Sequence, residues 1–158
     1  MDGQTLDRLL DYSARSFGDR IAAAEPGARD ICYDELNQLA GRISGFLQRM
    51  GVTRGDRVGI QLPKSIASLA AIFGVLRAGA AYVPVDCTAP GSRTAFIFSD
   101  CAVKFVILRS QDLAGPDSPY AAPVALDVVD PSLSSCVLAQ GPAGVSPGVD
   151  APADVAYI

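Results

Sequence analysis

The residue types that most often carry catalysis are sparse in this sequence. It contains no histidine, which excludes a Ser-His-Asp or Cys-His mechanism and any histidine-based metal site within these 158 residues. The cysteines show no C-x-x-C spacing, and the start of the sequence carries no secretion signal. We therefore expect reduced thiols of a cytosolic protein at Cys32, Cys87, Cys101 and Cys136.

Two short stretches have residue types that can bind anions. The glycine-rich run GPAGVSPG, 141–148, lacks the following lysine and the opening helix that a phosphate loop needs, so we interpret it as a linker. In LPKS, 62–65, Ser65 is placed to cap a helix and Lys64 could meet an anion at the same helix end. A solvated loop lysine is the simpler interpretation of Lys64.

Acidic residues offer no catalytic pair. The tripeptide RGD, 54–56, lies between a helix-ending glycine and a strand, so a turn explains it without any role in cell adhesion. Four other acids stand near strand or helix ends with no spacing that pairs them, and we interpret them as structural: Asp86, Asp100, Asp127 and Asp130. Residue type and spacing thus single out no catalytic, cofactor-binding or metal-binding residue.

The first third of the chain predicts two helices around a hairpin. Apolar residues from 5 to 17 repeat on one side of a helix. Pro26-Gly27 then forms a turn signal between two short apolar runs. The clearest helical period follows from 33 to 50, with Gly51 placed to end the helix. Its start is weak, because Cys32 stands where Ser or Thr would form a capping box with Glu35.

From Asp56 onward, strands alternate with helices. RVGIQL (57–62), AYVPVD (81–86) and KFVIL (104–108) are strand-like, whereas 65–79 and 92–101 are helix-like, the former apolar nearly all round and hence buried. This order predicts an α/β fold of βαβ units, with right-handed crossovers and a mainly parallel sheet flanked by helices. The expected core includes Ile60, Leu69, Phe73, Leu76, Val83 and Val106.

The composition agrees with one globular domain and disfavours nucleic acid and membranes as partners. Hydrophobic residues make up 49% of the chain, charged residues 19%, and the net charge is -4. Without a basic block, nucleic acid is not an expected partner. The longest apolar stretch, 66–81, is interrupted by Ser68 and Arg77 and is too short for a membrane span. A cytoplasmic location is expected.

Two phrases carry a family resemblance. CYDELNQLA (32–40) and LRAGAAYVPVD (76–86) resemble the two earliest core motifs of the adenylate-forming (ANL) ligases, in particular the amino-acid adenylation domains of nonribosomal peptide synthesis. GVTRGDRVGI (51–60) and PGSRTAFIFSDC (90–101), which keeps Pro90 and Arg93, are also similar, and the resemblance runs from Leu6 to Leu108. There are three departures from the family pattern: Cys32 for Ser or Thr, Arg77 for Lys, and Cys87 for Pro.

The resemblance implies the N-terminal part of an ATP-dependent ligase. Such an enzyme activates an amino acid, or a related small carboxylic acid, as an acyl-adenylate with release of pyrophosphate. It then loads the acyl group onto the phosphopantetheine thiol of a carrier protein. By the resemblance, ATP and Mg²⁺ are bound by residues beyond 158, so the partners of this segment are the remainder of the same enzyme, the acid and the carrier protein.

Two alternatives remain open at this point. One is an acyl-CoA synthetase or fatty-acid adenylating ligase of the same superfamily. The other is a non-catalytic module that binds a nucleotide or another protein, either complete as it stands or derived from a ligase.

The resemblance also suggests an organisation of the chain. Residues 1–108 form an N-terminal α/β subdomain, and 109–153 form an irregular Pro/Gly-rich segment with one candidate strand in VALDVV, 124–129. DVAYI, 154–158, matches the strand that in this family leads into the phosphate-binding loop. We therefore expect the sequence to be the front part of a longer ligase.

Overall fold

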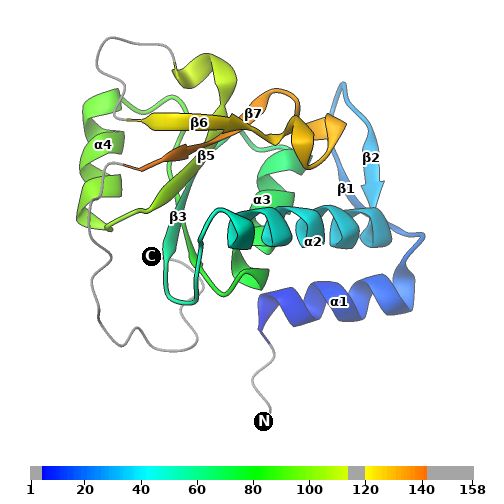
Figure 1. Ribbon diagram of the computed structural model, residues 1–158. Coiled ribbons are helices and arrows are strands. Elements are labelled where there is room, and N and C mark those ends of the chain that lie inside the picture. Colours follow the sequence, from blue (N-terminus) through cyan, green and yellow to red (C-terminus); the bar gives the residue numbers. More distant parts are fainter. Residues whose placement is uncertain (1–4, 114–119, 142–158) are drawn as a thin grey trace.

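The structure is a computed structural model that describes residues 5–113 and 120–141. A five-stranded sheet carries helices on both faces, and a small two-stranded sheet lies beside them (Figure 1). In chain order the elements are α1 Leu6–Phe17, β1 Ile21–Ala24, β2 Asp30–Cys32, α2 Tyr33–Arg49, β3 Arg57–Gln61, α3 Ile66–Arg77, β4 Ala81–Pro84, α4 Gly91–Asp100, β5 Phe105–Arg109, β6 Ala121–Ala125 and β7 Cys136–Gln140, with 3-10 turns η1 Ser110–Leu113, η2 Leu126–Val128 and η3 Pro131–Leu133.

The large sheet confirms the predicted α/β class. Its order is β4-β3-β5-β7-β6, and β3 pairs in parallel with both β4 and β5. β7 is antiparallel to β5 and to β6, so four of the five strands run in one direction. The steps from β3 to β4 and from β4 to β5 cross the sheet in opposite directions, and their helices α3 and α4 pack on opposite faces. The two crossovers therefore have the same hand.

The segment after residue 109 is more ordered than the sequence predicts. The candidate strand 124–129 is only partly right, because β6 begins at Ala121 and the chain turns into η2 at Leu126. A second strand, β7, was not expected, and it joins β6 to the sheet through five residue pairs with β5. CVLAQ is a short apolar run that is buried over four of its five residues, so it has no alternating pattern to mark it as a strand.

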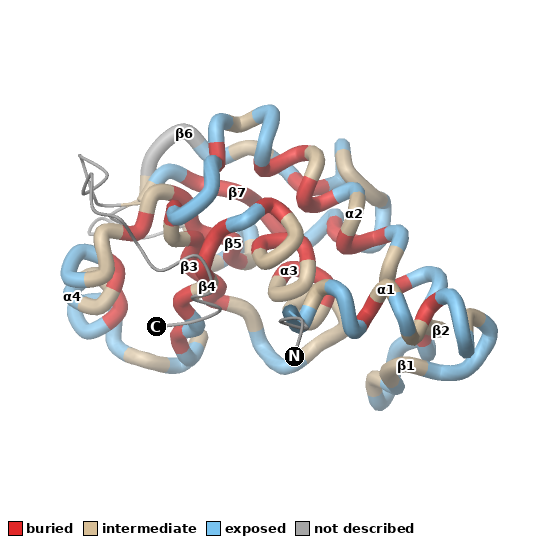
Figure 2. Tube along the Cα trace, turned by 90° about the horizontal axis from the view of Figure 1, so that it is seen from below, coloured by how far each residue is buried: buried red, intermediate tan, exposed pale blue. Residues whose placement is uncertain are grey.

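Successive strand residues point to opposite faces of the sheet, so their side chains form two hydrophobic cores, one on each face. Val58, Ile60 and Ile107 point toward α1, α2 and α3, whereas Val83 and Val106 point toward α4. Figure 2 shows the buried residues concentrated along the strands and the inner sides of the helices. This two-sided burial explains why the strand sequences are apolar without a break.

Glycines allow the closest contacts within both cores. A Cβ atom on Gly59 of β3 would lie 2.7 Å from Cε1 of Phe98, the fully buried ring that α4 places on the sheet. A Cβ atom on Gly74 of α3 would lie 2.6 Å from Cγ2 of Ile43 on α2. Both positions therefore exclude larger side chains, since packed interiors cannot absorb an added methyl group without movement.

The prediction that α3 is buried all round is wrong. Its buried residues are Ala70, Ala71, Gly74 and Val75, which lie on one side. The expected core residues Leu69, Phe73 and Leu76 are only half-buried, while Ile60, Val83 and Val106 are buried as predicted. Among the described residues, α1 and α2 cover α3 incompletely, so an apolar side of this helix stays partly exposed.

The N-terminal predictions are confirmed. β1 and β2 form the antiparallel hairpin, with Gly27 in its turn at φ +80°. α2 begins at Tyr33, and the Glu35 carboxylate accepts the backbone N–H of Cys32 at 3.0 Å, as in a capping box. Gly51 follows the helix at φ +93°. Within the described ranges, no helix has the length and apolar character needed to cross a membrane.

Candidate functional site

The ends of the parallel strands define the candidate site. β3 ends at Gln61 and β5 ends at Arg109, which pairs with Cys136 at the start of β7. In open α/β sheets, ligands bind outside the carboxyl ends of the strands, where the strand order reverses. Here that reversal occurs around β3, because β4 lies on one side of it and β5 on the other. We call this edge of the sheet the carboxyl edge.

A hollow of about 370 Å³ opens at the carboxyl edge. The β1–β2 hairpin, the start of α3, the end of β5 and the segment from η3 to β7 surround it, and we call it the edge hollow. Its apolar lining is Leu39, Leu62, Ile66, Ala67, Leu133 and Cys136. Burial raises the pKa of the Cys136 thiol, so at neutral pH this lining residue is uncharged.

The first turn of α3 is capped beside the edge hollow. Ser65 Oγ accepts the Ser68 backbone N–H at 3.1 Å, and Ser68 Oγ accepts the Ser65 N–H at 3.0 Å, which confirms Ser65 as the predicted N-cap. Glu25, from the hairpin, accepts the backbone N–H of Ile66 at 2.9 Å. A carboxylate at this position also meets the positive end of the helix, so the contact fastens the hairpin to the carboxyl edge.

The cations near the edge hollow are engaged or solvated. Arg109 binds both oxygens of Asp112, at 2.7 and 3.0 Å, and this carboxylate raises the pKa of the guanidinium further above its ordinary value. Arg29 lies 3.5 Å from Glu35. Lys64 is exposed and forms no ion pair with any residue that the structure describes, as expected for a solvated loop lysine.

On the α4 side of the carboxyl edge, two polar side chains are hydrogen-bonded to each other. Tyr120 Oη donates to Gln61 Oε1 at 2.5 Å, and its ring lies 6.5 Å from that of Phe98. Burial, with a contribution from the charge of Asp112, raises the pKa of Tyr120 to about 12. The phenol therefore stays protonated at neutral pH and acts as a donor that holds the start of β6, not as a base.

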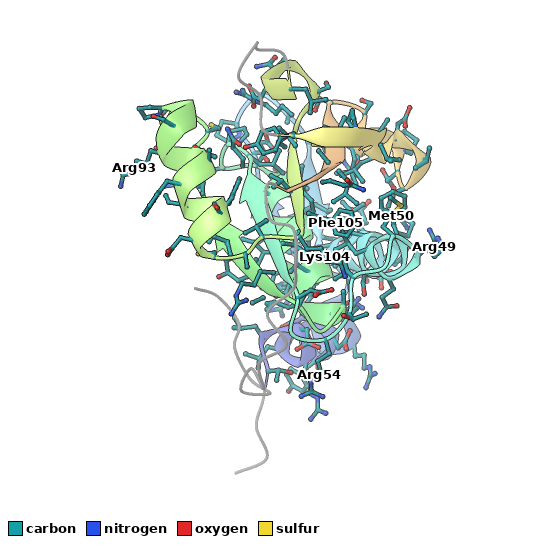
Figure 3. All side chains as sticks on the ribbon, turned by 60° about the vertical axis from the view of Figure 1, so that its left-hand side comes forward. Arg49, Met50, Arg54, Arg93, Lys104 and Phe105 are labelled. Carbon is teal, nitrogen blue, oxygen red and sulfur yellow. The ribbon has the colours of Figure 1, made fainter. Side chains whose placement is uncertain are left out.

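The RGD tripeptide is a structural turn, as predicted. Asp56 accepts the backbone N–H of Thr53 at 2.7 Å and receives Lys104 Nζ at 2.8 Å, and only 8% of its side chain is exposed. Burial opposes its ionisation, but the hydrogen bonds from Lys104 and Thr53 outweigh burial and lower the pKa of Asp56. Lys104 also donates to the Gly51 carbonyl at 2.8 Å, close to the loop that carries Arg54 (Figure 3).

Two of the four remaining acids, Asp86 and Asp130, make contacts that agree with a structural role. Asp86 accepts the backbone N–H and hydroxyl of Thr88, which lowers the pKa of Asp86. Asp130 caps η3 and pairs with Arg42 at 2.6 Å. Asp100 and Asp127 are exposed. Over residues 5–113 and 120–141, no group of three or more Cys, Asp or Glu is placed to hold a metal ion.

Two sequence features cannot be followed into the structure. Of the glycine-rich run 141–148, only Gly141 belongs to the described residues. The stretch 154–158, expected to lead into a phosphate-binding loop, lies outside them. The absence of catalytic residues from this chain therefore stays a prediction.

Comparison with known proteins decides the family. The model of the AMP-binding enzyme family matches residues 10–158. The chain belongs to the AMP-binding enzyme family. This confirms the resemblance to adenylate-forming ligases that the two core motifs indicate.

Several curated AMP-binding enzymes are similar in sequence. Syringomycin synthase SyrB1 of Pseudomonas syringae pv. syringae is 32% identical over 99% of this chain and 24% of its own length. A salicyl-AMP ligase/salicyl-S-ArCP synthetase of Mycobacterium tuberculosis is 44% identical over 59% of this chain and 17% of its own length. The chain thus spans about a quarter or less of the curated relatives it matches.

Solved AMP-binding enzymes share the fold. The nonribosomal peptide synthetase FmoA3, in a form bound to α-methyl-L-serine-AMP, superposes with a TM-score of 0.66 at 33% identity, over 70% of this chain and 12% of that one. The N-terminal domain of FACL13 from Mycobacterium tuberculosis superposes with a TM-score of 0.64 at 28% identity, over 66% of this chain and 26% of that one.

One departure from the family motifs, Arg77, has a visible structural role. Arg77 donates to the Asn37 carbonyl at 2.9 Å, to Asn37 Oδ1 at 2.6 Å and to Asp11 Oδ1 at 2.6 Å, so it joins α1, α2 and α3. A lysine, usual at this position, could not form the same fork. The motif residue Arg93, in contrast, projects from the outer side of α4 (Figure 3).

Sequence reasoning missed the edge hollow and the Arg77 network. Both are assembled from segments far apart in the chain, such as Asp11 and Arg77, which are 66 positions apart. The one usable signal was Arg77 itself, a charge at the end of a mostly apolar helix, which has to find a partner when the helix packs.

Proposed function

We propose that this chain is the N-terminal scaffold of an ATP-dependent ligase that activates an amino acid, or a related small carboxylic acid. The observation that carries the proposal is the family match over residues 10–158, together with relatives that include peptide synthases. One solved relative, a nonribosomal peptide synthetase, is bound to α-methyl-L-serine-AMP, and two curated relatives are surfactin synthase subunit 1 and tyrocidine synthase 1.

The proposed reaction has two steps. A carboxylate oxygen of the acid attacks the α-phosphorus of ATP, the bond to the β-phosphate oxygen breaks, and pyrophosphate leaves with the electron pair. The thiolate of a carrier-protein phosphopantetheine then attacks the acyl carbon, and AMP leaves as the thioester forms. Both steps develop charge on phosphate oxygens, which needs cationic groups and N–H donors placed beforehand.

The described residues fit a supporting role in this reaction. Two of the charged groups near the carboxyl edge have partners within the chain, Arg109 with Asp112 and Glu25 with the backbone N–H of Ile66, while Lys64 is solvated. The described residues contain no group of three or more Cys, Asp or Glu placed to hold a metal ion. From the resemblance to adenylate-forming ligases, we assign ATP and Mg²⁺ binding to residues beyond 158 and the burial of two cores to this part.

Exchange of labelled pyrophosphate into ATP tests the proposal. The complete enzyme that carries this chain is expected to catalyse exchange only when its acid is present, whereas the 158-residue chain alone is expected to catalyse none. Exchange by the 158-residue chain would contradict the scaffold role, and a complete enzyme that never exchanges with any amino or aryl acid would contradict the ligase assignment.

An acyl-CoA synthetase or fatty-acid adenylating ligase is the second candidate. It is favoured by the likeness to FACL13 and to a fatty acyl-CoA synthetase of Mycobacterium tuberculosis, both at 28% identity. The acceptor separates the two: thioester formation on free CoA supports the synthetase, and thioester formation on a phosphopantetheine-bearing carrier protein supports the first proposal.

A non-catalytic nucleotide-binding or interaction module is the third candidate. It predicts saturable binding of ATP or FMN by the 158-residue chain. A titration monitored by calorimetry that gives no heat of binding removes the nucleotide-binding form of this candidate.

A further inference from the structure

The lining of the edge hollow is mostly apolar although the hollow lies at the protein surface. Leu62, Ile66 and Ala67 are only half-buried, while Leu39 and Leu133 form its buried floor. Exposed apolar concavities cost free energy unless another group fills them, and they mark sites where a ligand or another polypeptide segment binds.

The polar groups around the edge hollow already have partners. The Glu25 carboxylate accepts the backbone N–H of Ile66, and Arg109 donates to the Asp112 carboxylate. The Ser65 hydroxyl accepts the backbone N–H of Ser68 and donates to the Pro63 carbonyl. Ser132 Oγ donates to Asp130 at 2.6 Å. Recognition of a charged small molecule needs convergent polar groups that are available, so this lining suits an apolar group instead.

The apolar surface continues from the edge hollow along α3. Ile66, Leu69 and Phe73 follow the spacing i, i+3, i+7, so they share one side of the helix, and all three are half-buried. A surface that extends past the hollow along a helix is larger than a small ligand would cover. It matches the packing of another piece of protein.

We propose that the edge hollow seats an apolar side chain from the part of the same polypeptide that lies outside these 158 residues. This inference rests on the proposed function, in which the chain is one part of a longer ligase. The relatives support this occupant, since this chain accounts for only 24% of SyrB1 and 17% of the salicyl-AMP ligase. A covalently linked segment is also held at high effective concentration beside the hollow, which favours it over a separate partner.

Ala67→Gln tests the proposal, with Ser92→Gln as its matched control. Ala67 is the second residue of α3 and lines the edge hollow, while Ser92 is the second residue of α4 and is exposed outside it. The two changes therefore place the same side chain at the same helical position. Ala67→Gln alone carries the few tenths of a kcal/mol by which Gln is a poorer helix former than Ala, and that cost is common to the complete enzyme and the 158-residue chain. In the 158-residue chain, the glutamine at 67 can reach water through the open hollow.

Thermal unfolding of the complete enzyme and of the 158-residue chain gives the readout. We expect Ala67→Gln to lower the melting temperature of the complete enzyme by about 2 °C or more while shifting that of the 158-residue chain by less than about 1 °C. Ser92→Gln is expected to shift neither.

Three outcomes would overturn the proposal: no shift in the complete enzyme, an equal shift in both proteins, or a shift that changes with protein concentration. The last would identify a second copy as the occupant. Pyrophosphate exchange is measured on the same samples. An enzyme with the expected shift in melting temperature but without exchange would disprove the proposed function, while the proposed occupant of the edge hollow would still be supported.

Discussion

Replacing Arg77 by methionine removes the side chain that joins the three helices on one face of the sheet. Its guanidinium gives two hydrogen bonds to Asn37 and one to Asp11, and only 22% of the Arg77 side chain is exposed. Methionine keeps most of the aliphatic length, so the change removes the hydrogen bonds more than the packing.

The cost follows from those contacts. The two hydrogen bonds to Asn37 contribute about 1 kcal/mol each. The ion pair with Asp11, which is 38% exposed, is screened by solvent and contributes only about 0.2–1 kcal/mol. Arg77→Met should therefore lower the free energy of unfolding by about 2–3 kcal/mol, which corresponds to a fall in melting temperature of about 5–10 °C for a chain of this size.

Urea unfolding of the 158-residue chain, followed by circular dichroism, measures this loss. Arg42→Met is the control, because Arg42 also forms one short ion pair, with Asp130, but is 46% exposed, and its loss should cost less than about 1 kcal/mol. Arg77→Lys should fall between the two, since an ammonium keeps a contact but not the fork. If Arg77→Met costs no more than Arg42→Met, the network does not stabilise the helical layer as we argue.

Three further predictions concern the two cores and the loop before β3. Phe73→Ala should reduce the free energy of unfolding of the complete enzyme, by somewhat less than the ~3–5 kcal/mol typical of a fully buried ring, because Phe73 is only half-buried. The melting temperature should fall while the choice of acid stays unchanged; altered selectivity with a normal melt would contradict this. Gly59→Ala should destabilise by about 1–3 kcal/mol through contact with Phe98, and Phe98→Leu should restore part of the loss in a double-mutant cycle; additive losses would show that the ring is not the obstacle. The pKa of Asp56 is lower in the folded protein than in the unfolded chain, so the ionised carboxylate stabilises the fold at neutral pH. This stabilisation is lost as the pH falls below the ordinary pKa of 3.8 and through the folded pKa. Asp56→Asn should therefore weaken the dependence of unfolding free energy on pH in acid, and an unchanged dependence would count against the pairing with Lys104.

The sequence predicts the elements best where local periodicity and burial agree. α2 repeats its apolar residues at helical spacing with a glycine after its last turn, and both of its boundaries fall where expected. β7 cannot be identified in this way, because its run of four apolar residues is compatible with a strand or a helical segment. Its identity depends on pairing with β5, a partner 27 or more positions away, which no local pattern reports.

The site is less predictable than the fold for a related reason. Ser65 is found from its own neighbours, because an N-cap is a local device. Glu25 is not, because its role arises only when the hairpin lies next to the first turn of α3, 41 positions later in the chain. α3 shows the limit of composition: an almost wholly apolar helix suggests complete burial, but the described residues cover only one side of it.

The place of β7 in the sheet has a consequence for biosynthesis. A ribosome releases β3, β4 and β5 well before β7, so the nascent sheet carries the open edge of β5 until residues 136–140 emerge. During that interval the unpaired amides of an apolar strand are available to any other extended chain nearby. Slow translation or a ribosomal stall between residues 110 and 135 would lengthen the interval, and chaperone capture is expected to be greatest there.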